Sequence, residues 1–298
     1  MLRRYWMRHR ARRSRRSATA EWMAVAEPIA EVPAARTKLP ISAYVICKNE
    51  ERDIERCLKS LASCAQIIVV DSGSTDGTLA IVEELARSGL PIRLIKRDWP
   101  GYAAQKQFAM DQASEPWCLG LDADERMDAR LQGELARLIS ADQSIAAWRL
   151  RRRPVSIFGV GPVSAGIYPK PVLRLTRRGR ARYDLDTLVH EHIIVDGKVR
   201  DCLQGVIEHE KRLSFEDQLR KELVYARLKA TQRVNAGRRP SLLRLIFNPA
   251  AYFLRLYLLH RWFLCGRLGF IHAATGAVYA FCTEAIHFEL WRARPGRE

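Results

Sequence analysis

The sequence predicts an α/β fold in which helices cover both faces of a mostly parallel sheet. Apolar runs of strand length alternate along the chain with stretches whose apolar residues recur at helical spacing. The runs are apolar nearly throughout, which is typical of strands that are buried on both faces. At 298 residues the chain is long enough for one such domain and an appendage.

Four strands and four helices make up the first half of the predicted domain. Asn49 is expected to cap the first helix, and Asp128 the fourth. The turn-rich loop 71–77 opens the second helix. We expect strands at residues 41–47, 66–70, 92–95 and 117–121, and helices that include residues 54–61, 79–85, 101–113 and 131–138.

Residues 146–210 are predicted to be rich in strands. Turn residues at 177–180 separate two short β-type runs, and Asp196-Gly197 separates two more. Each pattern predicts a β-hairpin. Such hairpins often build the acceptor side of an active site.

Helices are predicted beyond residue 213. Ser214 begins the first of them, with Asp217 placed as in a capping box, and Gly237 with Pro240 ends it. Residues 241–290 are rich in Leu, Phe, Tyr and Trp, interleaved with arginines. The longest run without charged residues, 268–283, is shorter than the roughly 20 residues that span a bilayer. We therefore expect amphipathic helices over 214–298 that lie on a membrane surface, pack on the catalytic domain, or both.

Composition restricts the partners. The net charge is +17, which calls for nucleic acid, anionic lipid or a phosphorylated substrate. Residues 1–40 are rich in arginine and are expected to form a disordered tail, or an arm attracted to anionic lipid. The seven cysteines form no Cys-x-x-Cys pair, so we expect reduced thiols in a cytosolic protein.

Two carboxylates follow the predicted strand 117–121. On an extended chain Asp122 and Asp124 point to the same face, where they repel each other unless a positive charge lies between them. Carboxylate oxygens are typical ligands of Mg²⁺ and Mn²⁺. A solvated turn is the alternative for this motif alone. However, the polar clusters 48–50 and 71–76 also follow strands, and ligands of parallel sheets bind at that edge.

These motifs resemble those of the family 2 glycosyltransferases, which have the GT-A fold. Residues 42–125 are similar to the half of that fold that binds the nucleotide sugar, and the resemblance covers most of residues 41–290. Further segments resemble the branch that includes lipopolysaccharide-core glucosyltransferases of the WaaE (KdtX) type. The matching segments are Lys48-Asn49-Glu50-Glu51, residues 69–76, residues 121–125, Trp99-Pro100-Gly101-Tyr102 with Gln105-Lys106, Tyr168-Pro169 with Arg174-Leu175, and Leu188-Val189-His190-Glu191.

The resemblance implies an inverting transferase that moves glucose or a similar hexose from a nucleotide-diphosphate sugar. The acceptor would be the lipopolysaccharide core or another lipid-linked glycan. It implies a catalytic domain at 41–213, with a donor half at 41–145 and an acceptor half at 146–213. In the donor half, Asp124 is the first choice of metal ligand, Asp122 holds the ribose or assists the metal, and the donor is contacted by Glu50, Asp71, Gln105 and Lys106.

A general base is expected in the segment His190-Glu191-His192. Inverting transfer needs a group that takes the proton from the attacking acceptor hydroxyl. Glu191 is the candidate, oriented by His190. Polar residues at a strand edge are the structural alternative, and a metal role for His190, His192 or His209 is a further one. Zinc peptidase chemistry is not expected, because no His-Glu-x-x-His is present.

Two other classes of function compete with sugar transfer. A nucleotidyltransferase would need a glycine-rich loop after the first strand, where this chain has residues 48–51 without glycine. A nucleic-acid-binding protein would carry a recognisable binding module, and the densest basic cluster is the tail instead. We therefore expect no nucleic-acid partner, and a cytoplasmic enzyme bound peripherally to the inner face of the membrane through anionic lipid.

Overall fold

The computed structural model describes residues 38–294, with gaps at 168, 186–191, 211 and 213. Most of the predicted tail, and the predicted catalytic residues His190 and Glu191, therefore lie outside the described residues. Contacts between residues join the described residues into a single unit.

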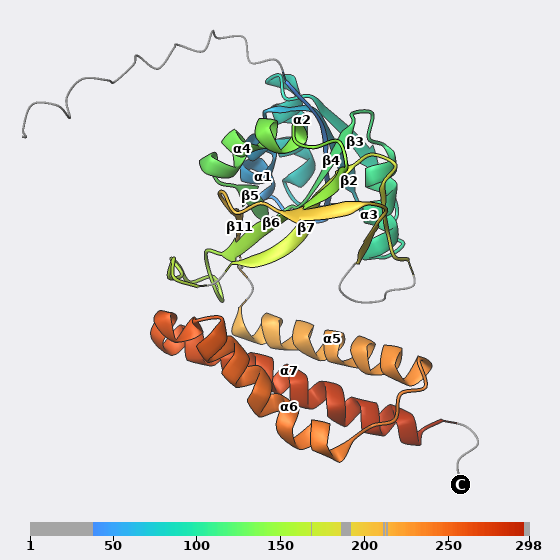
Figure 1. Ribbon diagram of the computed structural model, residues 1–298, viewed down its shortest axis with the longest axis vertical. Helices are drawn as coiled ribbons and strands as arrows, with labels where there is room; N and C mark the ends of the chain where they lie inside the picture. The colour runs from blue at the N-terminus through green and yellow to red at the C-terminus, as the bar shows by residue number, and fades with distance from the viewer. Residues whose placement is uncertain (1–37, 168, 186–191, 211, 213, 295–298) are drawn as a thin grey trace, which may run out of the picture. The chain divides into compact units, whose positions relative to one another are not determined.

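A nine-stranded sheet forms the centre of the fold, in the order β3-β2-β1-β4-β7-β6-β11-β5, with β10 paired to β6 (Figure 1). The first four strands run parallel, and β7 runs antiparallel to both β4 and β6. The predicted α/β sheet is thus confirmed. The strands are β1 Leu39–Cys47, β2 Cys64–Asp71, β3 Ile92–Lys96, β4 Trp117–Asp122, β5 Glu125–Met127, β6 Ile145–Pro154, β7 Lys170–Arg177, β10 Lys198–Asp201 and β11 Ile207–His209. A separate ribbon pairs β8 Ala181–Tyr183 with β9 Ile193–Val195.

Helices cover both faces of the sheet. The larger core cluster joins the sheet to α1 Ile54–Ser60, α2 Thr78–Arg87 and α4 Ala129–Ile139. A second cluster joins the opposite face to α3 Tyr102–Asp111 and the β8–β9 ribbon. Burying apolar side chains on both faces is what the uninterrupted apolar strands required.

Two of the three predicted helix caps are confirmed. Asp128 accepts a hydrogen bond from the Leu131 amide, and Ser214 accepts one from the Asp217 amide, as predicted. The prediction for Asn49 is wrong, because Asp53 occupies the N-cap position of α1. Asn49 has a left-handed backbone with φ 56°, whereas a capping residue is usually extended.

Both predicted hairpins are wrong. The strands that flank residues 177–180 do not pair with each other; β7 pairs in the main sheet, while β8 pairs with β9. The strands around Asp196-Gly197 also separate, because β10 adds to β6. Gly197 has φ 128° and lies against Ala146, so close that an added Cβ would be 2.8 Å from the Ala146 Cβ. The turn residues are where the sequence placed them, but tertiary contacts choose the partner strands.

Three long helices follow the sheet: α5 Phe215–Asn235, α6 Leu242–Leu254 and α7 Gly266–Arg292. Short segments, η1 Arg255–Leu259 and η2 Trp262–Cys265, connect α6 to α7. The three long helices are held by Glu284, which is 1% exposed. Its carboxylate accepts hydrogen bonds from Arg233 of α5 at 2.7 Å and from Asn248 of α6 at 2.8 Å.

The C-terminal helices expose large apolar side chains. By length and composition alone, one helix in the described part of the chain, Leu242–Leu259, could cross a membrane, and none of it is buried. Arg244 and Arg255 leave only ten uncharged residues between them, too few to span a bilayer. Exposed apolar residues in this region include Leu243, Phe247, Leu254, Leu258, Leu259, Phe263, Phe270 and Phe281.

Candidate active site

The carboxyl ends of β1, β2 and β4 lie side by side at one edge of the sheet. In the parallel register Cys47 lies opposite Asp71, and Ile46 lies opposite Asp122. The polar residues that follow these strands therefore meet, as the sequence predicted. This is the edge at which open parallel sheets bind ligands.

The loops after β1 and β2 are joined by hydrogen bonds. The Asn49 Oδ1 atom accepts a hydrogen bond from the Thr75 amide at 2.8 Å. The Glu51 carboxylate accepts one from the Gly77 amide at 2.9 Å. These bonds explain why Asn49 is not a helix cap: its side chain connects two loops that lie far apart in sequence.

Asp71 shapes the loop after β2. It is 1% exposed, and its Oδ2 atom accepts hydrogen bonds from the amides of Gly73 at 2.9 Å and Ser74 at 3.0 Å. Its Oδ1 atom accepts a hydrogen bond from the Ser74 hydroxyl. With both oxygens engaged, Asp71 holds the loop in position. A direct contact between Asp71 and a donor nucleotide stays a prediction.

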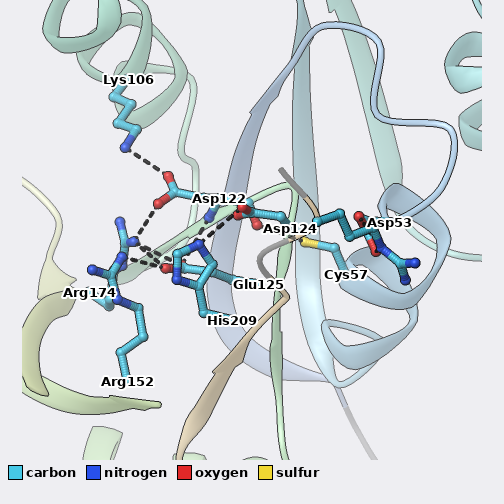
Figure 2. Close-up of polar contacts among 10 residues, drawn as sticks. Asp53, Cys57, Lys106, Asp122, Asp124, Glu125, Arg152, Arg174 and His209 are labelled. Carbon is cyan, nitrogen blue, oxygen red and sulfur yellow. Dashed lines mark hydrogen bonds and ion pairs between the residues drawn. The ribbon is translucent and has the colours of Figure 1, made fainter. Parts of the chain in front are cut away.

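Asp122 ends β4 between two cations. Lys106 Nζ lies 2.7 Å from its Oδ1 atom, and Arg174 Nη2 lies 2.6 Å from its Oδ2 atom (Figure 2). Burial raises the pKa of Asp122, but Arg174 and then Lys106 outweigh burial and hold that pKa well below its ordinary value. The repulsion expected between Asp122 and Asp124 is therefore relieved by protein cations.

A buried ion cluster lies behind Asp122. The Glu125 side chain has no exposed surface and accepts hydrogen bonds from Arg174 at 2.8 Å and from Arg152 at 2.9 Å. Its Oε2 atom also accepts one from the Asp122 amide at 3.1 Å. Neither arginine was assigned a role from the sequence. The signal was an arginine within the apolar run 172–175, because a buried arginine needs a carboxylate partner.

Asp124 faces His209 of β11. The His209 Nε2 atom lies 3.0 Å from the Asp124 Oδ2 atom (Figure 2). The Glu210 amide donates a hydrogen bond to the Asp124 carbonyl at 3.0 Å, which holds β11 beside this residue. Within the described residues no cluster of three or more His, Cys, Asp or Glu forms a complete metal cage. The Asp124 carboxylate nevertheless fits Mn²⁺ or Mg²⁺ when substrate oxygens supply further ligands, and the His209 imidazole is a ligand more typical of transition metals than of Mg²⁺.

Glu50 follows β1 at the same edge of the sheet. Its amide donates a hydrogen bond to the Thr78 hydroxyl at 2.7 Å, which fixes the loop after β1. Burial, followed by the negative charges of Asp124 and Asp53, raises the pKa of Glu50 to about 7. At neutral pH its carboxyl group therefore carries a proton part of the time and can then donate a hydrogen bond.

Gln105 and Lys106 differ in their surroundings although they are neighbours on α3. Lys106 lines the cavity described below and contacts Asp122. Gln105 is fully buried; it donates a hydrogen bond to the Ser72 hydroxyl at 2.9 Å and accepts one from Arg97 at 2.8 Å. Gln105 therefore supports the loop after β2, and a contact with the donor stays a prediction.

A cavity of about 1080 Å³ opens at the strand ends. Four predicted residues line it: Glu50, Lys106, Asp122 and Asp124. The wall continues to the C-terminal helices, and the cavity volume is at the upper end of the range for small-molecule sites. The basic residues of the wall are Lys106, Arg149, Arg152, Lys170, Arg174, Arg212 and Lys221.

The β8–β9 ribbon borders the cavity through Tyr183 and residues 193–195. The hydroxyl groups of Tyr183 and Tyr44 lie 2.9 Å apart, and the Tyr183 amide donates a hydrogen bond to Gln107 at 2.7 Å. These contacts anchor the ribbon to β1 and α3. Glu191 lies outside the described residues, but its neighbour His192 lines the cavity.

The parallel sheet, the Asp-x-Asp segment at the end of β4 and the adjoining cavity define a GT-A-like α/β enzyme. Residues 42–201 match the family model described as glycosyl transferase family 2. The chain therefore belongs to this family, and it is a glycosyltransferase. The alternatives of a nucleotidyltransferase and a nucleic-acid-binding protein are thereby set aside.

Named relatives agree with this assignment. The chain is 48% identical over 248 residues to a lipopolysaccharide core biosynthesis glycosyltransferase, LpsC of Rhizobium meliloti, covering 83% of this chain and 92% of the relative. It is 27% identical to an uncharacterized glycosyltransferase of Rickettsia typhi, covering 81% and 83%. A mannosyltransferase of Pyrobaculum calidifontis, solved with GDP-Man and Mn²⁺, shares the fold with a TM-score of 0.52 at 17% identity, covering 87% of this chain and 89% of that one.

Proposed function

We propose that this enzyme transfers a hexose from a nucleotide-diphosphate sugar to the lipopolysaccharide core, with inversion at the anomeric carbon. The acceptor class is supported by the similarity to LpsC over 92% of that relative's length. The observation that carries the donor assignment is the convergence of Lys106, Asp122 and Asp124 on one cavity at the strand ends.

The residues around the proposed donor position have different roles. Asp122 is held by Lys106 and Arg174 in one orientation, so its carboxylate can accept hydrogen bonds from ribose hydroxyls without reorganising. Lys106 places a positive charge beside the position of the leaving diphosphate. The linked loops after β1 and β2 form the wall for the base, with Asp71 holding the second loop in shape.

Asp124 and His209 would hold a divalent cation. Both side chains line the cavity, and they lie within hydrogen-bonding distance of each other. When bound, Mn²⁺ or Mg²⁺ would supply a Lewis acid that stabilises the charge on the leaving diphosphate. Asp122 is the weaker ligand candidate, because both of its oxygens already face protein cations.

Glu191 remains our proposed base, with His190 as the residue that orients it. Transfer to a hydroxyl needs a carboxylate or imidazole near the attacking oxygen. The support from the described residues is that His192, the next residue in the chain, lines the same cavity.

The C-terminal helices would hold the enzyme on the inner face of the cytoplasmic membrane without crossing it. Exposed apolar side chains on α6, η1 and α7 alternate with arginines, a composition suited to anionic lipid surfaces. A lipid-linked acceptor would then meet the enzyme at the membrane surface.

A transfer screen tests the proposed function. The full-length protein is incubated with UDP- or ADP-sugars, with Mn²⁺ or Mg²⁺, and with truncated lipopolysaccharide cores as acceptors. We expect one pair to give a glycosylated product whose anomeric configuration, read by NMR, is opposite to that of the donor. Asp124→Ala, which removes the proposed metal ligand, should lose this transfer. Asp142→Ala, at an exposed turn, serves as its matched control. Retention of the anomeric configuration, or no transfer with any donor, would contradict the proposal.

A further inference from the structure

Two like charges lie directly opposite each other in the β6–β7 pair. The register places Arg152 against Lys170, and both residues line the cavity. Like charges at opposed positions destabilise a sheet. Arg152 has a carboxylate partner in Glu125, but Lys170 faces a cation across the strands. The arrangement is understandable if an anion binds there.

Two more basic groups lie near Lys170, because Ile167, three residues before it, packs in one apolar cluster with Leu256 and Tyr257 of η1. Arg255 begins η1, and His260 follows its end. Loss of water lowers the pKa of Lys170, and the positive charges of Arg152 and Arg255 lower it further. Loss of water also lowers the pKa of His260, as do the charges of Arg255 and Lys170. Among the described residues, no carboxylate pairs with the side chain of Lys170, Arg255 or His260.

Arg152, Lys170, Arg255 and His260 form a basic group that begins behind the donor residues, where Arg152 shares Glu125 with Arg174, and extends away from them at Lys170. Lys170 precedes Arg174 by four positions on β7, roughly 13 Å along an extended strand. That separation is more than the length of one sugar ring. An anion at Lys170 would therefore not be the donor diphosphate beside Asp122, although it would occupy the same cavity.

Apolar surface adjoins the basic group on the other side. Leu254 and Leu258 flank Arg255 and are 52% exposed, and Leu259, next to His260, is 75% exposed. A ligand with an anionic group and a lipid part would match this basic group with apolar surface beside it. It would place its anion on the basic group, its lipid part beside η1, and its glycan in the cavity.

We propose that Lys170, Arg255 and His260, with Arg152, bind a phosphate group carried by the lipid-linked acceptor. The inference rests on the proposed function, which it extends from the acceptor's class to the group that is recognised. Multiply charged phosphate suits the Lys170 and Arg255 cations, which have no carboxylate partner among the described residues, and charge-assisted hydrogen bonds are strong. A neutral His260 can still donate one ring N–H to such a group. We assign the phosphate to the acceptor and not to a bulk phospholipid, because Arg152 and Lys170 line the cavity that contains the donor residues.

Binding to vesicles tests the assignment without requiring turnover. The full-length protein is sedimented with phosphatidylcholine vesicles that carry a truncated lipopolysaccharide, either with its phosphates or after their chemical removal. Vesicles with phosphatidylglycerol at matched charge report the contribution of phospholipid headgroups. The variants are Lys170→Gln and Arg255→Gln, and Arg267→Gln, an exposed arginine of α7, is the matched control. Transfer assays on both acceptors run in parallel.

We expect the wild type to bind the phosphorylated acceptor about ten-fold more tightly or better than the dephosphorylated one, the range for losing one charged hydrogen bond. Lys170→Gln and Arg255→Gln should lose that preference, Arg267→Gln should keep it, and the KM for the donor should not change.

The inference is overturned if the wild type shows no phosphate preference, or if Arg267→Gln loses as much of it as the other two. It is also overturned if binding to phosphatidylglycerol vesicles shows the same dependence on Lys170, because the site would then recognise headgroups. Phosphate-dependent binding without transfer would contradict the proposed function alone.

Discussion

Replacing Arg174 with Met should destabilise the fold more than any surface charge change. Arg174 is 8% exposed and pairs with Asp122 and Glu125. Methionine keeps much of the side-chain volume but removes the charge. The Glu125 carboxylate, which has no exposed surface, would then keep only Arg152 as a partner.

The expected loss of stability follows from the burial of the Glu125 carboxylate. Removing one partner of a buried ion pair costs about 3–5 kcal/mol, because the remaining charge stays buried without compensation. Arg152 compensates part of the Glu125 charge, so we expect the lower end, about 3 kcal/mol. For a domain of this size each kcal/mol shifts the melting temperature by about 2–4 °C. The variant should therefore melt roughly 6–12 °C below the wild type.

Thermal unfolding followed by circular dichroism measures the shift. Arg180→Met is the control, since Arg180 pairs with Asp196 on the surface, where an ion pair contributes little. Adding Glu125→Gln to Arg174→Met should recover part of the loss, because the second change removes the uncompensated charge. The buried cluster does not stabilise the fold as proposed if Arg174→Met has the same melting temperature as Arg180→Met. The same holds if the double variant melts no higher than Arg174→Met alone.

Four further predictions concern the metal, the base, the membrane and pH. Asp124→Ala should abolish metal-dependent donor binding in a folded protein; unchanged affinity and metal dependence by calorimetry would exclude it as a ligand. Glu191→Gln should lower turnover by about 10²-fold or more at nearly unchanged donor affinity, and near-normal turnover would point instead to Asp184 or Asp186. Carbonate or high salt should release at least part of the enzyme from membranes, and protease access to the C-terminus from the far side would rule out a peripheral position. Burial is the main cause that lowers the pKa of His287. Its contribution to stability is therefore complete above its unfolded pKa of about 6.5 and is lost as pH falls through the lower folded value, so His287→Gln should flatten the pH dependence of urea unfolding there.

The edge of the sheet that carries Asp122 and Asp124 was largely predictable from the sequence because its signals are local. Each apolar run ends where its strand ends, and parallel strands bring their carboxyl ends to one edge. Asp122, Asp124, Glu50 and Lys106 line one cavity for that reason. Asp71 and Gln105 were also placed near this edge, but their hydrogen bonds go to the loop after β2.

The contacts that depend on tertiary structure were not predictable in the same way. Arg174 reaches Asp122 because β7 is inserted next to β4, and no local pattern indicates that neighbour. The two hairpins failed for the same reason, since turn residues specify a reversal but not a partner strand. The positive charge expected beside Asp122 is present, but its source could not be read from the sequence, because Lys106 and Arg174 come from α3 and β7, 16 and 52 residues away.

The anchored ribbon has a consequence for how acceptor preference can change. Tyr183 and Ile193, the residues on either side of 184–192 in the chain, are paired with each other. The ribbon is tied to Tyr44, whose hydroxyl lies so close to Gly120 that a methyl group there would come within 2.5 Å of it. The segment between β8 and β9 thus starts and ends at a fixed pair of residues. Exchanging it between homologues should alter the acceptor that is used while the donor site keeps its structure, whereas Gly120→Ala should disturb both halves at once.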